Sequence, residues 1–286
     1  MANEAAVLRG VQKQYKDFTL GPIDLTVPTG TIVGLVGENG AGKTTTLKLL
    51  CGVNRVDAGE ITLLGGIPSD PAVRARLGVV FEDAYFYGGL NAEHIGKSMA
   101  GIFGSAWNAA QFAHFLQRFG LDARQKISEY SRGMRMKLSL ATALAHDPDL
   151  LVLDEATAGL DPVVRSEMLD LFLEFIQDER HSILMSSHIT SDLEQVADSI
   201  AYLHHGQLLF HENKDTLMQE YGLLRCNRSD LEKLPADCVI YTRENAFGCE
   251  SLVKDRTAVQ RLLPGAVCDP ADIDDIMRYY SGRDAQ

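Results

Sequence analysis

The sequence predicts an α/β fold in which a largely parallel β-sheet is covered by helices. Three short apolar runs have the composition of buried strands. The helical pattern "KTTTLKLLCG" follows the first of these runs, and the helical pattern "PVVRSEMLDLFLEFIQDE" lies between the second run and the third. Strands that alternate with helices in this way pair in parallel. The three runs are "TIVGLV" (residues 31–36), "DLLVLDE" (149–155) and "SILMSSH" (182–188).

Two further strands are expected ahead of the first buried run. The segments "VLRGVQKQY" and "FTLGPIDLTVP" alternate apolar and polar residues, which is typical of a sheet with one covered face. Pro28 and Gly30 then close a turn before the buried strand begins.

The middle of the chain changes to helical periodicity. Between residues 84 and 146, the segments "NAEHIGKSMAGIF", "NAAQFAHFLQRFGL" and "GMRMKLSLATALAHD" have the spacing of amphipathic helices, and Gly120 is placed to end one of them. We expect a helical subdomain inserted into the α/β core.

The last part of the chain predicts a small α+β appendage. Short strand patterns ("LLRCN", "DCVIYTREN", "CESLVKD") are mixed with short helical patterns ("RSDLEKL", "RTAVQRLL", "DIDDIMRYY"). We therefore expect one domain over residues 1–215, with the helical subdomain at about 84–146, and an extension over residues 216–286. No functional motif is recognisable in the extension.

Composition limits the classes of function. The 286 residues are 45% hydrophobic, which is enough for a sizeable core, and carry a formal net charge of −12, which argues against broad binding to nucleic acid or to an acidic membrane. No apolar run approaches the roughly 20 residues that span a bilayer, and the N-terminus lacks a secretory pattern. We expect a cytoplasmic chain that reaches a membrane only through a partner.

The five cysteines, four of them in the last quarter, have the wide spacing of reduced thiols, although a metal site there is conceivable.

The strongest motif is "GENGAGKTT", which follows a predicted strand and opens a predicted helix. Its glycines let consecutive backbone N–H groups surround phosphate oxygens, and the helix directs its positive end at them. Lys43 adds a charge for the β- and γ-phosphates, and the Thr44 hydroxyl is placed to bind Mg²⁺. The predicted nucleotide-binding residues are Gly37, Glu38, Asn39, Gly40, Ala41, Gly42, Lys43, Thr44 and Thr45.

Two acidic residues follow the buried run "LLVL". Because the carboxyl ends of parallel strands meet at one edge of a sheet, Asp154 is expected beside the phosphate loop, where it would hold the metal through a water molecule. Glu155, the next residue, would polarise the attacking water. Acidic, solvated residues are common at strand ends, so the two carboxylates indicate a catalytic site only because a phosphate loop is expected beside them.

His188 ends the third buried run. Its imidazole is expected at the same sheet edge as Lys43 and Asp154, where it would donate a hydrogen bond to the γ-phosphate. A histidine at a strand end is also a common structural or surface residue.

The stretch "YSRGM" opens another predicted helix. Ser131 is a favourable N-cap, and a helix start with a hydroxyl, a glycine and free N–H groups binds anions. The alternative is an ordinary capped helix. Because the chain already has one phosphate loop, we expect this second helix start to contact the nucleotide of another copy.

Taken in order, "GENGAGKTT", "YSRGM", "LLVLDEATAGLDP" and "SSH" resemble the nucleotide-binding subunits of ATP-binding-cassette (ABC) transporters over roughly residues 7–211. The resemblance implies a P-loop NTPase (RecA-like) core with an antiparallel β subdomain, ATP and Mg²⁺ as cofactors, and a head-to-tail dimer. In such a dimer Ser131 and Gly133 contact the γ-phosphate on Lys43 of the other copy, and Asp161 lies at the seam. Tyr15 matches the aromatic residue that stacks on adenine, although a core tyrosine is the competing interpretation.

Two positions depart from the family pattern. Arg132 stands where the usual Leu-Ser-Gly-Gly-Gln motif has its first glycine, and Glu82 stands where a glutamine usually contacts Mg²⁺ and senses the membrane partner. A carboxylate still binds a hard cation, so Glu82 stays a predicted metal and nucleotide contact. These features, with the ending "DIDDIMRYYSGR", are similar to the small cassette subunits of bacterial exporters for peptides, antibiotics or related amphiphiles.

The resemblance implies an ATPase subunit, paired with a second, identical cassette, that drives a separate integral-membrane subunit from the inner face of the membrane. The aromatic residues Tyr85, Phe86 and Tyr87 could receive a helix of that subunit or could pack within the helical subdomain. A soluble ABC ATPase that acts on ribosomes or DNA is the alternative, but the single phosphate loop and the negative net charge of the chain argue against it. A regulator with a dead site is opposed by the full set Lys43, Thr44, Asp154, Glu155 and His188.

Overall fold

The computed structural model describes residues 4–82, 86–245 and 248–283. Its centre is a six-stranded sheet in the order β5-β6-β7-β3-β8-β9, in which every neighbouring pair is parallel except β8 and β9. The predicted α/β fold is confirmed. The strands are β3 (Ile32–Val36), β5 (Leu77–Val80), β6 (Leu150–Asp154), β7 (Ser182–Ser187), β8 (Ser199–His204) and β9 (Gln207–Asn213).

The three strands predicted as buried, β3, β6 and β7, have no exposed residue. Each is covered on both faces, which is why the sequence runs are continuously apolar rather than alternating. α1 (Lys43–Leu50) and α7 (Thr190–Val196) contact strands of this sheet, and α6 (Pro162–Phe175) shares a hydrophobic cluster with it. The short helix α2 (Pro71–Arg74) leads into β5.

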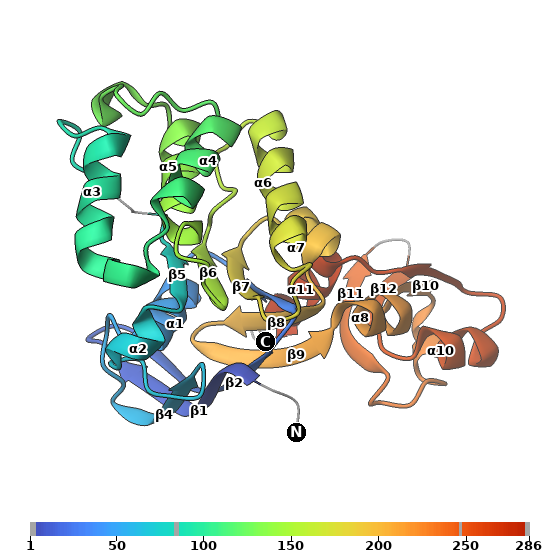
Figure 1. The fold of residues 1–286 in the computed structure, drawn as a ribbon. Helices are drawn as coiled ribbons and strands as arrows, with labels where there is room; N and C mark the ends of the chain where they lie inside the picture. The colour runs from blue at the N-terminus through green and yellow to red at the C-terminus, as the bar shows by residue number, and fades with distance from the viewer. Residues whose placement is uncertain (1–3, 83–85, 246–247, 284–286) are drawn as a thin grey trace.

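A separate antiparallel sheet, in the order β2-β1-β4, lies at the lower left of the molecule in Figure 1. Its strands are β1 (Glu4–Gln14), β2 (Thr19–Pro28) and β4 (Ala58–Leu63). The inward residues of this sheet pack with α1 and one face of the central sheet in a shared hydrophobic cluster.

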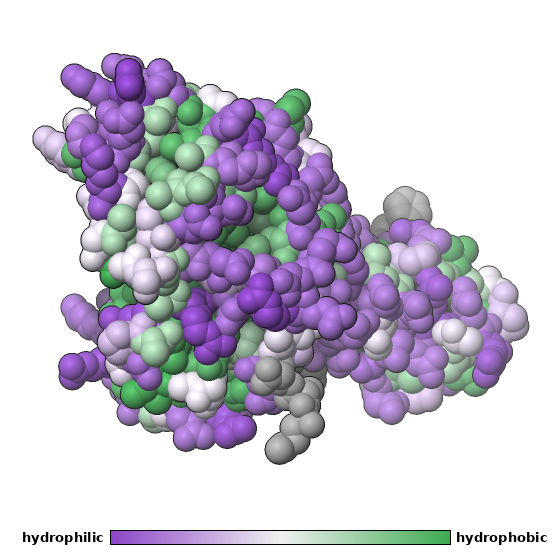
Figure 2. All heavy atoms as spheres, viewed as in Figure 1, coloured by the Kyte–Doolittle hydropathy of each residue, from purple (hydrophilic) through white to green (hydrophobic). Residues whose placement is uncertain are grey.

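The inserted helices form a lobe at the top of Figure 1. Gly120, with φ of +65°, follows the end of α4 as the sequence predicts for a helix stop. Figure 2 shows hydrophobic residues in the hollow between the helices of this lobe and α6. The lobe contains α3 (Ala92–Phe103), α4 (Ala109–Arg118), α5 (Arg132–Leu144) and two short 3₁₀ turns, Gly104–Ala106 and Ile127–Glu129.

The C-terminal appendage is an antiparallel sheet in the order β11-β12-β10-β13 with small helices, on the right of Figure 1. Its last helix returns to the core. Within the described residues, no helix has both the length and the apolar composition needed to cross a bilayer. The appendage elements are α8 (Lys214–Glu220), β10 (Gly222–Cys226), α9 (Arg228–Leu231), β11 (Val239–Asn245), β12 (Gly248–Val253), α10 (Arg256–Leu262), β13 (Val267–Pro270) and α11 (Ile273–Arg283).

Candidate functional site

The glycine-rich loop between β3 and α1 forms a backbone cradle. Gly40 and Gly42 have φ of +85° and +111°, a region that side chains disfavour. A Cβ on Gly37 would lie 2.2 Å from the carbonyl oxygen of Leu203, so the loop passes too close to β8 for any other residue. The loop therefore leads into α1 with its N–H groups available to an anion.

Lys43, the first residue of α1, is buried although it is charged. Its Nζ donates to the carbonyl oxygens of Gly37 (2.7 Å) and Glu38 (3.3 Å). It also lies 3.3 Å from Oε1 of Glu155. The ammonium group is thus held at the mouth of the loop by acceptors that a phosphate could replace.

Thr44 and Asp154 face each other across α1 and the end of β6. The Thr44 hydroxyl donates to Oδ1 of Asp154 at 3.1 Å, and Ser186 on β7 donates to the same oxygen at 2.6 Å. Asp154 is buried. This hydroxyl and carboxylate suit a hard cation such as Mg²⁺. Within the described residues, no group of three or more His, Cys, Asp or Glu side chains could hold a metal, so an ion here would also need phosphate or water oxygens.

Glu155 has φ of +52°, a left-handed conformation that is costly for a residue with a side chain. Its backbone N–H donates to the Ser186 hydroxyl at 3.2 Å. One carboxylate oxygen, Oε2, lies 2.6 Å from Nδ1 of His188. The other, Oε1, is buried and has no hydrogen-bond partner, despite its proximity to Lys43. A buried carboxylate oxygen that has no hydrogen-bond partner and lies beside a phosphate loop can accept a proton from water.

Ser186 was not predicted as a site residue, although the quoted run "SILMSSH" contains it. Its hydroxyl joins the two acids, since it bonds to Asp154 and to the Glu155 backbone. A polar residue in an otherwise apolar buried strand was the available signal. The structure therefore brings five predicted side chains together at the carboxyl edge of the central sheet: Lys43, Thr44, Asp154, Glu155 and His188.

Ser131, Gly133 and Asp161 lie apart from this group, around a depression of about 360 Å³. Ser131 caps α5 by accepting from the Met134 N–H at 3.2 Å, and Asp161 caps α6 through Oδ1. A Cβ on Gly133 would meet nothing closer than 3.7 Å. The depression is thus lined by the starts of two helices and has room at Gly133.

The two residues that depart from the family pattern contact each other. Nη2 of Arg132 lies 3.3 Å from Oε1 of Glu82, and about half of each side chain is exposed. The guanidinium also covers Gly159, where an added Cβ would lie 2.7 Å from Nη1. Among the described contacts, Glu82 touches neither Thr44 nor Asp154, so the structure does not bring it to the other predicted metal ligands.

Tyr15 lies just after β1 and is 40% exposed, so it is not a core residue. Its ring is 6.4 Å from that of Phe18, whose Cζ would lie 3.0 Å from a Cβ added to Gly42. Of the predicted docking aromatics, Phe86 packs partly against the core, Tyr87 is 77% exposed, and Tyr85 lies outside the described residues.

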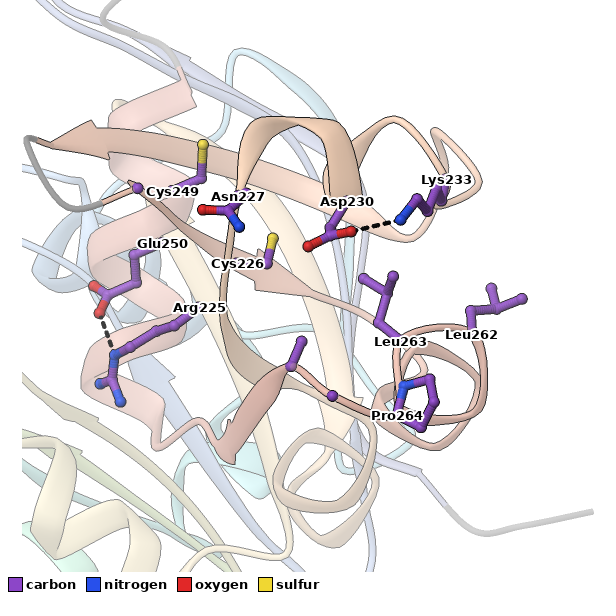
Figure 3. A pocket seen from close by; sticks show the side chains of 13 residues that line it. Arg225, Cys226, Asn227, Asp230, Lys233, Cys249, Glu250, Leu262, Leu263 and Pro264 are labelled. Atoms are coloured by element: carbon purple, nitrogen blue, oxygen red, sulfur yellow. Dashed lines mark hydrogen bonds and ion pairs between the residues drawn. The ribbon is translucent and has the colours of Figure 1, made fainter.

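A cavity of about 700 Å³ lies in the appendage, far along the chain from the phosphate loop (Figure 3). Its charged residues already pair with one another: Arg225 bonds to Glu250 at 2.9 Å, and Lys233 bonds to Asp230 at 2.6 Å.

The five cysteines are free, as expected for reduced thiols. Burial, followed by the charge of Asp154, raises the pKa of Cys51 to about 12, so this thiol at the end of α1 stays neutral and unreactive.

The ABC transporter family model matches residues 20–158. An uncharacterized ABC transporter ATP-binding protein of Synechocystis is 36% identical over 70% of this chain, which spans 58% of that protein's length. The bacitracin transport ATP-binding protein BcrA of Enterococcus faecalis is 35% identical over 70% of this chain and 67% of its own length. The Nod factor export ATP-binding protein I of Burkholderia lata is 31% identical over 97% of both chains.

Solved structures agree on the fold. The structure of an ATP-binding subunit of an ABC transporter has a TM-score of 0.66 and 26% identity, and the similarity covers 74% of this chain and 91% of that one. A dimer of the cassette MJ0796, bound to ADP and phosphate after hydrolysis, also has a TM-score of 0.66, at 21% identity over 73% of this chain and 98% of its own.

Proposed function

This chain belongs to the ATP-binding subunits of ABC transporters, and we propose that it binds ATP with Mg²⁺, hydrolyses it and drives a separate membrane subunit. The appendage cavity in Figure 3 is a weaker candidate site because its charges pair internally. The observation that carries the proposal is the meeting at one sheet edge of five side chains: Lys43, Thr44, Asp154, Glu155 and His188.

The chemistry follows from the positions of these groups. The loop N–H groups and Lys43 bind the β- and γ-phosphates, and Lys43 exchanges its contacts with Glu155 and the loop carbonyls for phosphate oxygens. Thr44 and Asp154 would hold Mg²⁺, which neutralises charge on the phosphates when bound. Glu155 then orients the attacking water and accepts its proton, while His188 fixes the Glu155 carboxylate and contacts the γ-phosphate.

We further propose that two identical copies close head to tail, with Ser131, Gly133 and Asp161 of one copy against the nucleotide of the other. The separation of this group from the first cluster supports the idea, as does the open space at Gly133. We also propose that Tyr15 stacks on adenine, which its exposure supports. Glu82 would contact the ion only after its carboxylate leaves Arg132.

The partner and cargo are proposed from resemblance. The names of the bacitracin and Nod factor relatives favour an exporter of peptides or related amphiphiles over an ATPase of ribosomes or DNA. Exposed Tyr87 and the hydrophobic hollow in Figure 2 support docking of a membrane subunit beside the helical lobe. We propose a nucleotide-binding domain over residues 1–215, an extension over 216–286, and a location at the inner face of the membrane.

The variant Glu155→Gln tests the catalytic role. It keeps the shape of the side chain but removes the base, so we expect kcat for ATP hydrolysis to fall by about 100-fold or more while ATP binding persists. Phosphate release and the binding of a fluorescent ATP analogue are measured side by side. Glu60→Gln, at an exposed position on β4, is the matched control. Hydrolysis at the wild-type rate in Glu155→Gln would remove Glu155 from this role.

A further inference from the structure

The C-terminal appendage forms one wall of a second pocket beside the phosphate loop. This pocket, which we call the loop pocket, has a volume of about 620 Å³. One side is the outer part of the phosphate loop, including Glu38, together with His188. The other side is formed by β11 and α11, which contribute Arg243, Asp274 and Met277.

α11 is fixed to the nucleotide-binding core rather than to the appendage alone. Ile273, Ile276 and Tyr279 are buried in the same hydrophobic cluster as the core helices and strands. The Ile273 N–H donates to Glu194 on α7 at 3.0 Å, and Ser281 lies 2.7 Å from the hydroxyl of Tyr202 on β8. The wall of the loop pocket is thus held in place by contacts at both ends of the helix.

Arg243 on β11 brings a positive charge to this pocket. Its guanidinium stacks on the Tyr279 ring, with Cζ 4.7 Å from the centroid, and Nη2 donates to the carbonyl oxygen of Arg278 at 3.0 Å. Within the described residues, no carboxylate lies at ion-pair distance from Arg243, whereas Arg278 is paired with Asp275. A cation that is oriented but not neutralised is suited to an anionic partner.

Only one side of the loop pocket belongs to the predicted nucleotide site. Gly37, Glu38, Asn39 and His188 line that side, whereas Lys43 and Thr44 do not line the pocket. The side formed by β11 and α11 carries none of the predicted nucleotide contacts, so a bound nucleotide would leave it open to another protein segment.

A segment with the right chemistry is the corner that starts α6, residues 161–163. All three residues of this corner are exposed, including Val163 at 69%. Asp161 uses Oδ1 to cap α6, which leaves its other oxygen for an external donor. The corner thus offers a carboxylate for Arg243 and an apolar side chain for Met277.

We propose that the loop pocket receives the α6 corner of a second copy, with Arg243 of the appendage binding Asp161 across the interface. This inference rests on the proposed head-to-tail pair, in which the same corner already approaches the phosphate loop. It assigns the appendage a direct part in closing the nucleotide site, which residues 7–211 alone would not provide.

The test uses residues 1–286 with Glu155→Gln, which is expected to retain ATP, and measures dimerisation by sedimentation with and without Mg²⁺ and ATP. Adding Arg243→Glu places a carboxylate opposite Asp161, and we expect the dimer dissociation constant to rise about tenfold or more. Arg261→Glu, the same change at an exposed appendage position, should leave it unchanged. Binding of a fluorescent ATP analogue to the monomer should be equal in all three proteins.

The outcomes separate the two proposals. If Glu155→Gln binds ATP but stays monomeric, the head-to-tail pair is wrong. If it dimerises equally well with and without Arg243→Glu, the pair stands and the role of Arg243 is wrong. If Arg243→Glu weakens ATP binding by the monomer, the loop pocket serves the nucleotide, which also overturns the inference.

Discussion

Arg132 and Glu82 each replace a residue usual in ABC cassettes, and in this structure they form an ion pair across 50 positions of sequence. Because both side chains are about half exposed, the pair contributes about 1 kcal/mol or less to the free energy of unfolding. The pair matters more for the segments that it connects than for this free energy. Arg132 holds the Glu82 carboxylate and covers Gly159, so it joins the loop after β5, the start of α5 and the loop before α6.

This pairing predicts how Mg²⁺ dependence responds to mutation. Arg132→Gln frees the Glu82 carboxylate, so the Mg²⁺ concentration that gives half-maximal ATP hydrolysis should fall. In a Glu82→Gln background the same change should have no effect, because the carboxylate is gone. Arg135→Gln, which removes an exposed cation of the same helix, is the control. An equal effect of Arg132→Gln in both backgrounds would show that the two side chains act independently.

At the residue scale, local patterns were sufficient to predict the glycine-rich turn between β3 and α1 and the capping role of Ser131. That this turn binds phosphate stays a prediction. The partners of Arg132 could not be predicted, since Glu82 and Gly159 approach it only through the tertiary fold. The strained backbone at Glu155 is likewise a property of the loop around it.

At the scale of elements, burial on both faces made β3, β6 and β7 predictable as continuous apolar runs. The sequence interpretation missed β4, β5, β8, β9 and β13. β4 and β9 have many exposed or half-buried residues, and β5 and β13 contain only four residues each, too few for a period to be recognised. β8 is almost as buried as β3, and its run "SIAYLH" was the available signal.

The packing of α11 predicts that the appendage and the core share stability. Ile276→Ala removes a fully buried side chain from the main cluster and should cost about 2–5 kcal/mol. The single tryptophan, Trp107, lies in the helical lobe in the same cluster and reports on the core. We therefore expect its fluorescence transition in urea to move to lower concentration in Ile276→Ala.

Leu262→Ala, at a 52% exposed position of the appendage, is the control for that experiment and should move the transition little. An unchanged Trp107 transition in Ile276→Ala, with the appendage unfolding at lower urea by another probe, would mean that α11 does not stabilise the core.

At the scale of the whole molecule, the predicted architecture is confirmed: a mixed sheet, an antiparallel sheet, a helical lobe and an α+β appendage. The position of the appendage could not be predicted, because its contacts with the core depend on the buried face of α11 and on Tyr202 in β8. The two groups of candidate residues also lie in separate places on one chain. This separation is the physical basis for proposing a site completed by two copies.

Mixing two inactive variants tests that central claim most directly. Lys43→Ala loses its own phosphate loop but keeps Ser131 and Gly133, whereas Gly133→Asp keeps the phosphate loop and, because of the open space at that position, its fold. A head-to-tail pair that contains one copy of each variant has one intact site and one site that carries both changes. Because about half of randomly formed pairs are mixed, roughly one quarter of all sites are complete. We predict that the mixture regains ATP hydrolysis that neither variant shows alone. Activity no greater than the sum of the two variants would contradict the shared site.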